Sequence, residues 1–291
     1  NGKVIIGFGG ADFGNSRGYV SAYDTESGKL LWRWWIVPGD PAKGFENAAM
    51  EMAAKTWAGE WWKMGGGGAV WNAMAYDPDT NTVFLGTGNG GPWNHKARSQ
   101  GKGDNLFLAS IVALDGDTGT YKWHYQVSPG ESWDYSAAMD IEFADLEIDG
   151  KVRKVLMQVP KNGFFYVIDR TNGQLISAEP IVKVNWASKI DLKTGRPVEN
   201  PAARYPNGTT FTMWPSGNGG HNWYPMAYSP QTKLAYVPVL ERAMTYADWE
   251  LKDNRWQQFQ PVGTIQSATM NSLPEVDDPL NRTSRLEAWN P

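Results

Sequence analysis

The chain has 291 residues, a formal net charge of −4 at pH 7 and no cysteine. Its 27 Lys and Arg residues are scattered, so nucleic acid is not an expected partner, and no run of 18 apolar residues could cross a membrane. The lack of Cys excludes disulfides, thiolate catalysis and a covalent c-type haem motif from this segment.

Short β-rich stretches separated by turn sequences run along the whole chain, which also contains 16 Trp and 32 Gly. Two stretches of this kind around an Asp, Thr, Asn or Gly turn are the signature of a β-hairpin. The first apolar runs are 3–10 ("KVIIGFGG") and 18–35, the second folding back at "DTESG". Further hairpins are predicted in four ranges, which are 72–89, 109–126, 154–180 and 225–241.

Two segments interrupt this pattern. Residues 47–62 ("NAAMEMAAKTWAGEWW") are rich in Ala, Met, Glu and Lys and predict the only convincing helix, inserted between two hairpins. Residues 185–222 are polar and contain Pro and Gly, which predicts a long ordered loop. A loop of that length in a compact domain is usually functional.

Three of the predicted hairpins align with one another. The stretches 22–32 ("AYDTESGKLLW"), 113–123 ("ALDGDTGTYKW") and 167–177 ("VIDRTNGQLIS") each have an Asp with a Gly four residues later. Asp24, Asp115 and Asp169 are therefore interpreted as turn residues. Repeated hairpins at unequal spacing favour an all-β fold of the β-propeller type over a sandwich.

The sequence lacks the common catalytic motifs, because it has no Gly-x-Ser-x-Gly, no Walker loop and no His-Glu-x-x-His. The glycine run 65–71 leads into a strand rather than a helix, so it is not expected to bind phosphate. Small or polar residues next to aromatics instead mark several strand ends, which are 9–14, 65–71, 86–94, 131–135, 160–170 and 219–225.

In a propeller, such strand ends from successive blades converge on the axis, where Asp12, Asn89 and Asp134 could meet. Two carboxylates and an amide oxygen are hard ligands that suit Ca²⁺. Taken alone, each residue also has a simpler interpretation. Asp134 follows Pro129-Gly130 as a turn residue would, Lys161-Asn162-Gly163 has the form of a hairpin turn, and Trp71, Trp133 and Trp223 could be packing aromatics.

Three long stretches, 65–94, 103–135 and 154–180, resemble the pyrroloquinoline quinone (PQQ) dependent alcohol dehydrogenases. The resemblance extends over essentially the whole chain. It implies a periplasmic, eight-bladed β-propeller with tryptophan-type blade motifs and with quinone and metal ion on the axis. Residues 1–291 are then expected to be a partial PQQ-binding domain, truncated at both ends and holding roughly half of the blades.

The resemblance also implies roles for individual residues. Asp134 matches the catalytic base, which removes the substrate hydroxyl proton while hydride passes to the quinone C5. Asn89 matches an amide ligand of the metal, and Asp12 stands where the family usually has a metal-binding Glu. Ala69 stands where many relatives have a cofactor-contacting Thr. The other positions that match cofactor contacts are Gly10, Ala11, Trp71, Lys161, Asn222 and Trp223.

The same resemblance bears on the metal and the substrate. Lanthanide-dependent relatives carry a second Asp two residues after the base, where this chain has Ser136, and Asp140 is too far along to replace it. Ca²⁺ is therefore expected, with primary alcohols as substrates and a cytochrome or other acceptor for the electrons. Haem c is expected only in a missing C-terminal domain.

Two alternatives are also compatible with the sequence. One is a sugar or polyol quinoprotein dehydrogenase of the same fold. The other is a non-enzymatic propeller scaffold, which would have no reason to keep Trp71, Asn89, Asp134 and Lys161 together. As a fragment of a PQQ-dependent alcohol dehydrogenase, the chain alone is expected to expose open sheet edges and to be inactive.

Overall fold

The computed structural model describes residues 2–11, 15–72, 74–206, 209–247, 268–270 and 283–291. The chain divides into two compact units, one built from residues up to Ala138 and the other from residues from Met139 onward. No helix in the described ranges is long and apolar enough to span a bilayer.

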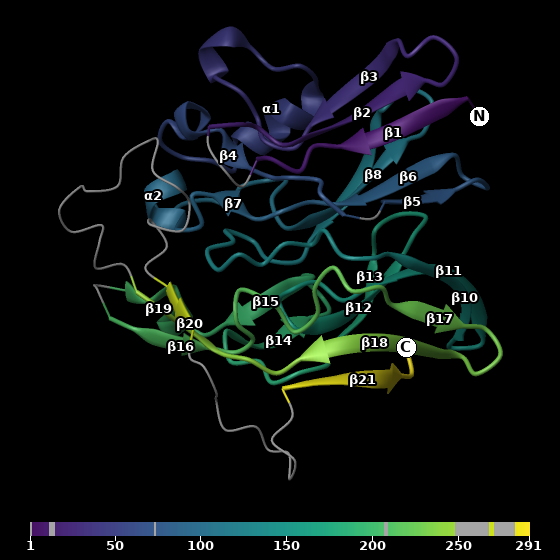
Figure 1. The fold of residues 1–291 in the computed structure, drawn as a ribbon, viewed down its shortest axis with the longest axis vertical. Coiled ribbons are helices and arrows are strands. Elements are labelled where there is room, and N and C mark those ends of the chain that lie inside the picture. The colour runs from purple at the N-terminus through teal and green to yellow at the C-terminus, as the bar shows by residue number, and fades with distance from the viewer. Residues whose placement is uncertain (1, 12–14, 73, 207–208, 248–267, 271–282) are drawn as a thin grey trace. The chain divides into compact units, whose positions relative to one another are not determined.

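The first unit consists mainly of two antiparallel sheets whose neighbouring strands follow one another along the chain (Figure 1). This up-and-down order is the form of a propeller blade, and it confirms the hairpins predicted in this part of the chain. The three-stranded sheet contains β1 (Lys3–Gly7), β2 (Tyr19–Asp24) and β3 (Leu30–Trp35). The four-stranded sheet contains β5 (Met74–Asp77), β6 (Thr82–Gly86), β8 (Ser110–Asp115) and β9 (Tyr121–Gln126).

The core of the first unit follows from the two-residue period of its strands. Alternate residues of a strand point to the same face, so apolar residues at every second position form one apolar surface. The buried residues that show this spacing come in pairs from four strands, and they are Val20 and Ala22, Trp32 and Trp34, Val83 and Leu85, and Val112 and Leu114.

The helical insertion of the first unit is more broken than predicted. Instead of one helix over 47–62, the structure has α1 (Ala48–Ala54) and the short 3₁₀ helix η2 (Trp61–Met64). Asn47 caps α1 by accepting a hydrogen bond from the Met50 N–H. After α1 the Trp57 indole donates to the Leu106 carbonyl, and Gly59 has a φ of +72°. These tertiary and backbone features override helix propensity in 55–60.

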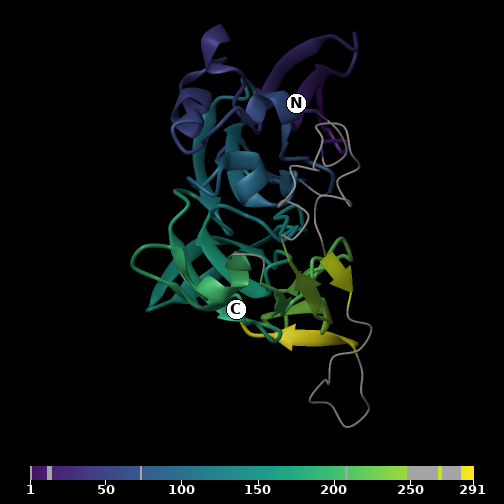
Figure 2. The same ribbon diagram turned by 90° about the vertical axis from the view of Figure 1, so that its left-hand side faces the viewer.

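Two further short helices were not predicted. They are η1 (Pro41–Lys43) and α2 (His95–Ser99). The second lies at the left of Figure 1 and faces the viewer in Figure 2. The pair β4 (Gly66–Gly67) and β7 (Gly90–Gly91) joins the glycine run to the segment before α2.

The second unit is also antiparallel throughout its described strands. A four-stranded sheet joins β10 (Glu142–Ile148), β11 (Lys151–Gln158), β12 (Phe164–Asp169) and β13 (Leu175–Pro180). The apolar core includes Val155, Met157, Phe165, Val167 and Val237. The smaller sheets contain β14 (Ala187–Asp191) with β15 (Arg196–Glu199), β16 (Phe211–Met213) with β19 (Met244–Tyr246) and β20 (Ala268–Met270), and β17 (Ala227–Ser229) with β18 (Leu234–Leu240) and β21 (Ser284–Trp289).

The prediction of a long loop over 185–222 was wrong. Within it lie the hairpin β14–β15, the 3₁₀ helix η3 (Pro201–Arg204) and β16. The β14–β15 turn runs from Asp191 to Gly195, whose N–H donates to the Asp191 carbonyl at 2.7 Å. It is a further copy of the Asp-x-x-x-Gly turn found in the three aligned hairpins.

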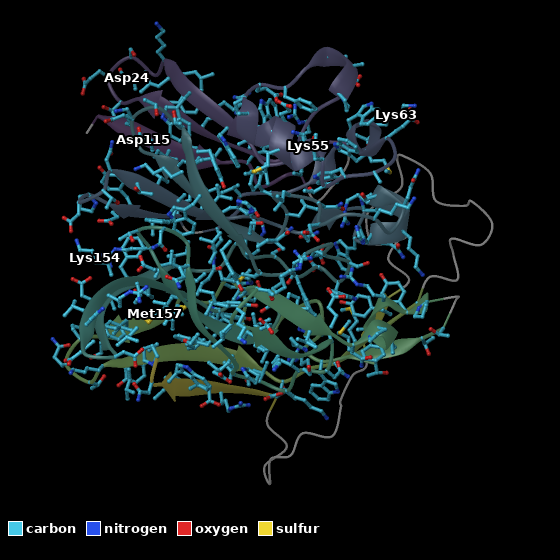
Figure 3. The ribbon with its side chains drawn as sticks, turned by 180° about the vertical axis from the view of Figure 1, so that it is seen from behind. Asp24, Lys55, Lys63, Asp115, Lys154 and Met157 are labelled. Atoms are coloured by element: carbon cyan, nitrogen blue, oxygen red, sulfur yellow. The ribbon has the colours of Figure 1, made fainter. Side chains whose placement is uncertain are left out.

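The turn role predicted for Asp24, Asp115 and Asp169 is confirmed, and Figure 3 labels the first two. The Asp115 carboxylate accepts from the N–H groups of Asp117 and Thr118, both at 3.0 Å. The Asp24 and Asp169 carboxylates make the same type of bond to residues just ahead of them. Such local bonds let a carboxylate shape a turn without any help from packing.

Candidate active site

Four strand-end segments of the first unit lie side by side. They contain residues 8–11, 65–71, 86–90 and 131–137, which overlap four of the strand ends predicted to converge, namely 9–14, 65–71, 86–94 and 131–135. Direct backbone hydrogen bonds connect each segment to the next, so the convergence does not depend on side-chain packing alone. These bonds are Val70 N–H to Phe8 O (2.9 Å), Gly88 N–H to Ala69 O (2.7 Å) and Ala137 N–H to Thr87 O (2.9 Å).

Glycine is required where these segments cross. A Cβ added at Gly86 would fall 1.9 Å from the carbonyl oxygen of Ala137, and one added at Gly90 would fall 2.0 Å from Nη1 of Arg98. Real Cβ atoms do not approach other atoms so closely. The lack of a side chain allows the Gly86 backbone to approach that of Ala137, and it leaves room for the Arg98 guanidinium beside Gly90.

Asn89 is held in one orientation within this group of segments. Its side-chain oxygen accepts from the Ser136 hydroxyl at 2.9 Å, and its backbone N–H donates to the same hydroxyl oxygen at 3.2 Å. Its amide nitrogen donates to the Gly90 carbonyl. Because an amide oxygen has two lone pairs, the Asn89 oxygen retains capacity for a cation beside its bond from Ser136.

Asp134 combines an unusual backbone conformation with partial exposure to solvent. Its φ is +66°, a left-handed conformation that costs a residue with a side chain about 1–2 kcal/mol, although Asp and Asn tolerate it best. All other residues from Val127 to Met139 are buried, whereas Asp134 is partly exposed. Asp134 is therefore the one partly exposed residue of this buried segment.

The aromatic residues on either side of Asp134 pack in the interior. For Trp133 this agrees with its interpretation as a packing aromatic. Trp133 and Tyr135 are both fully buried, with ring centroids 5.6 Å apart. Burial raises the pKa of the Tyr135 hydroxyl well above its usual value, and the negative charge of Glu131 raises it further. Tyr135 therefore stays neutral at physiological pH.

Glu131 holds the Asp134 turn against the Asn89 segment. It is fully buried, and its carboxylate accepts from the N–H groups of Trp133 and Tyr135 and from the N–H of Gly90. Arg98, also buried, donates to the backbone carbonyl of Glu131. The buried Glu131 carboxylate is thus satisfied by backbone donors, and the cationic Arg98 side chain of α2 donates to the backbone of the same residue.

The predicted cofactor contacts of the first unit lie on the same segments. Residues 65–70 are buried, but Trp71 is partly exposed at the end of that run. A planar aromatic ring could stack on an indole placed in this way. Ala69 and Ala11 are fully buried, and the Ala11 carbonyl lies 3.4 Å from the position of a Cβ added at Gly91. Gly10 is partly exposed.

The predicted metal ligand Asp12 lies outside the described residues. Among the residues that the structure does describe, no group of three or more His, Asp or Glu side chains could hold a metal ion. The predicted set of Asp12, Asn89 and Asp134 would not form such a group. Asn89 provides an amide oxygen, and Asp12 lies outside the described residues. The set remains a prediction, and Asn89 and the Asp134 turn are the part of it that the structure brings together.

The remaining predicted residues belong to the second unit. Lys161 is buried there, and its carbonyl accepts from the Gly220 N–H at 3.0 Å, which joins its loop to the loop that contains Asn222. The Asn222 side chain donates to the Asn218 carbonyl and accepts from the Trp223 N–H. Trp223 is 57% exposed and stacks on Tyr224, so it is not a core aromatic.

A cavity of about 270 Å³ lies elsewhere in the first unit. Its lining includes Lys3 and Asp117, which form an ion pair at 2.7 Å, together with Tyr76 and Asn81. None of the predicted site residues lines it. The candidate site is therefore defined by the four strand-end segments and not by this cavity.

Sequence reasoning did not identify Glu131 or Arg98. The available signal was a carboxylate three residues before Asp134 in a stretch with few other charges, "VSPGESWDY". That stretch does not reveal that Glu131 is buried or that its partner is Gly90, 41 residues away.

Comparison with known proteins shows extensive similarity. The family model for the β-propeller domain of PQQ glucose/ethanol/alcohol dehydrogenases matches residues 1–189. The quinohemoprotein alcohol dehydrogenase ADH IIB of Pseudomonas putida is 59% identical over 296 residues, which cover 99% of this chain and 42% of that protein. The chain thus spans about two fifths of the length of this relative.

Solved structures agree with this similarity. The quinohemoprotein alcohol dehydrogenase from Comamonas testosteroni matches with a TM-score of 0.90 and 48% identity, over 100% of this chain and 43% of that one. A europium-containing methanol dehydrogenase matches with a TM-score of 0.77 and 38% identity, over 85% of this chain and 44% of that one. The mostly β structure therefore matches part of a quinoprotein β-propeller, which confirms the predicted fold class.

Proposed function

Because this chain belongs to the PQQ-dependent quinoprotein alcohol dehydrogenase family, we propose that the full-length protein oxidises primary alcohols to aldehydes with PQQ and Ca²⁺. The observation that carries the proposal is the pairing of the two segments that contain Asn89 and Asp134. A hydrogen bond from Ser136 to Asn89 and the Glu131 carboxylate connect these segments in a buried part of the first unit.

Asp134 is the proposed general base. PQQ, when bound, supplies the hydride acceptor for the substrate carbon. The Asp134 carboxylate accepts the proton of the substrate hydroxyl as the carbon–hydrogen bond breaks. Its position as the only partly exposed residue of a buried segment leaves it accessible to a small alcohol. A neighbouring divalent cation keeps such a carboxylate ionised at neutral pH, which a base requires.

The proposed cation ligands are the Asn89 amide oxygen, the Asp134 carboxylate and Asp12. Oxygen donors of these kinds suit Ca²⁺. Ser136 supports a divalent ion, because its hydroxyl contacts Asn89 directly and adds no negative charge. Since a similar structure contains europium, the metal can be tested by Ser136→Asp. This change should shift binding preference from Ca²⁺ toward lanthanides, and unchanged selectivity would contradict the proposed role of residue 136.

The cofactor contacts proposed in each unit follow from the family resemblance. In the first, the partly exposed Trp71 offers an indole face for stacking, and Gly10, Ala11 and Ala69 contribute contacts from the strand-end segments. In the second, the Lys161 ammonium stabilises negative charge on the cofactor oxygens, with Asn222 and Trp223 as further contacts.

The remaining features of the proposal concern the whole protein. Electrons leave to a cytochrome or another acceptor, and the protein acts in the periplasm. Similarity to quinohemoproteins supports haem in a part of the protein beyond this chain. The family description also names glucose, so a sugar or polyol dehydrogenase is the second candidate. A comparison of kcat/KM for primary alcohols and for glucose distinguishes the two.

The proposal is tested by reconstituting the full-length protein with PQQ and Ca²⁺ and measuring dye-linked alcohol oxidation. Asp134→Asn should lower kcat by about 10²–10⁴-fold, the range for loss of a general base. Asn is the suitable replacement because it tolerates the left-handed backbone of Asp134. Asp115→Asn changes a turn carboxylate in the same unit and should leave kcat unaltered. Undiminished activity of Asp134→Asn would overturn the assignment of the base.

A further inference from the structure

We propose that Glu131 is a positioning residue that fixes the Asp134 turn relative to Asn89, and so determines how tightly the site binds its cation. The inference rests on the proposed function for the identity of the two ligands. It adds a residue that contacts neither substrate nor cofactor and acts through the backbone of both ligand segments.

The Glu131 carboxylate spans the two segments with its two oxygens. Oε1 accepts from the N–H groups of Trp133 (2.5 Å) and Tyr135 (2.9 Å), the residues on either side of Asp134. Oε2 accepts from the N–H of Gly90 (3.0 Å), the residue after Asn89. One planar group therefore sets the distance between two backbones that are 41 residues apart in sequence.

The contacts at Asp134 also explain its backbone. Two N–H groups that point to the same oxygen confine residues 133–135 to a tight turn, and Asp134 occupies its left-handed position. Without Oε1, this residue could relax toward a more common conformation. Its carboxylate would then change position relative to the Asn89 segment.

A carboxylate can bind the N–H groups of both segments at once, because it accepts hydrogen bonds at both oxygens and donates none. The arrangement is buried, and Arg98 adds further hydrogen bonds to it. Glu131 is fully buried, and Arg98 donates to its backbone carbonyl and to those of Pro92 and Trp93. Arg98 thus bonds to the backbone of Glu131 and to the chain that follows Gly90.

The substitution Glu131→Gln should break the hydrogen bonds to one of the two segments. An amide offers one oxygen and one NH₂ group, so it can serve the Trp133 and Tyr135 donors or the Gly90 donor, but not both. Loss of a group that orients a metal ligand typically weakens metal binding about 10–100-fold. We therefore expect Ca²⁺ to bind Glu131→Gln about 10–100-fold more weakly than wild type.

The experiment uses the full-length protein with PQQ bound and its metal removed, and measures the Kd of Ca²⁺ by calorimetric titration. Asp77→Asn is the matched control. The Asp77 carboxylate is likewise buried in the first unit and accepts from the Asp79 N–H, but in the β5–β6 turn. It should lower the unfolding temperature and leave the Kd unaltered.

The outcomes separate the inference from the proposed function. If wild type binds Ca²⁺ and Glu131→Gln binds it equally well, the positioning role is overturned and the proposed function stands. If wild type shows no saturable Ca²⁺ binding, both the positioning role and the proposed function are overturned. Should Glu131→Gln fail to fold, Glu131→Asp decides, because it keeps the charge but is too short to reach both segments. Wild-type Kd in Glu131→Asp would likewise overturn the inference.

Discussion

In the hairpin turns and in the strand-end site of the first unit, a carboxylate accepts hydrogen bonds from backbone N–H groups. The donors are near in sequence in the turns, whereas one of them is distant in the site. The Asp115 carboxylate bonds to Asp117 and Thr118, two and three residues ahead, at the surface. The Glu131 carboxylate bonds to its own turn and also to Gly90, a distant part of the chain, and is fully buried.

This difference separates two ways of shaping a backbone. A turn carboxylate works within five residues, so the turn forms wherever that short sequence occurs and contributes little to the rest of the fold. The carboxylate of the site links segments that come together only after the sheets have formed. Changes at the site should therefore cost more stability than changes at a turn, and they should affect function.

Paired glycine substitutions provide the largest expected contrast. In Gly86→Ala the new Cβ would lie 1.9 Å from the Ala137 carbonyl oxygen, and neither backbone can move without disturbing the site. We expect a loss of about 3 kcal/mol in the free energy of unfolding. In Gly28→Ala the Cβ meets open space, so only the φ of +67° penalises it, by about 1–2 kcal/mol, and the reduced freedom of the unfolded chain offsets about 0.4–1 kcal/mol of this cost.

Denaturant unfolding of both variants in the full-length protein measures this difference. Equal losses for the two variants would mean that the segments at the site can move apart to admit a side chain. The close approach at Gly86 would then not be a requirement of the fold.

The same contrast explains which features the sequence could predict. The hairpins were predictable because Asp-x-x-x-Gly is a local signal, and the three aligned copies form the expected turns. The β14–β15 hairpin was missed although Asp191 and Gly195 carry the same signal, because the polar, Pro-containing surroundings indicated a loop. The helix over 47–62 was predicted too long, since propensity does not reveal that the Trp57 indole bonds to Leu106.

The candidate site was predictable only in part. The strand-end positions of Asn89 and Asp134 could be inferred, and the structure brings their segments together. The roles of Glu131 and Arg98 could not, because burial and a partner 41 residues away leave no local pattern. Residues that position other residues through backbone contacts are therefore the ones that require the structure.

Loss of a turn carboxylate that has a charged partner should lower the free energy of unfolding by a smaller amount. The buried Asp169 bonds to Thr171 and forms an ion pair with Arg153 at 2.8 Å. Burial alone would raise the pKa of Asp169, but the hydrogen bonds from Thr171 and Arg153 outweigh it and lower the pKa. We expect Asp169→Asn to cost about 2 kcal/mol at pH 7, the range for a hydrogen bond to a charged group.

The pH dependence of this effect has a definite sign. Because the folded pKa is lower than the unfolded value of about 3.9, the stabilisation is complete above that value and is lost as the pH falls through the folded pKa. The difference between wild type and Asp169→Asn in unfolding free energy should therefore shrink on acidification below about pH 4. A difference that stays constant from pH 7 to pH 2 would contradict the assigned pKa direction.

The smallest effect concerns a turn that lacks the glycine. In the β17–β18 hairpin, Lys233 occupies the position that Gly28, Gly119 and Gly173 occupy elsewhere, with a φ of +57°. Its N–H donates to the Ser229 carbonyl at 2.8 Å, as the glycines do to their Asp residues. The left-handed conformation costs Lys233 about 1–2 kcal/mol. Replacement by Gly removes this cost but gives the unfolded chain additional freedom worth about 0.4–1 kcal/mol.

Lys233→Gly should therefore stabilise the protein by about 0.5 kcal/mol, the net of these two opposing contributions. Lys233→Ala is the matched control, because it removes the exposed side chain and keeps the backbone cost, so it should leave stability almost unaltered. Denaturant midpoints of the three proteins test this. A gain in Lys233→Ala equal to that in Lys233→Gly would assign the effect to the lysine side chain, and the backbone explanation for the turn would fail.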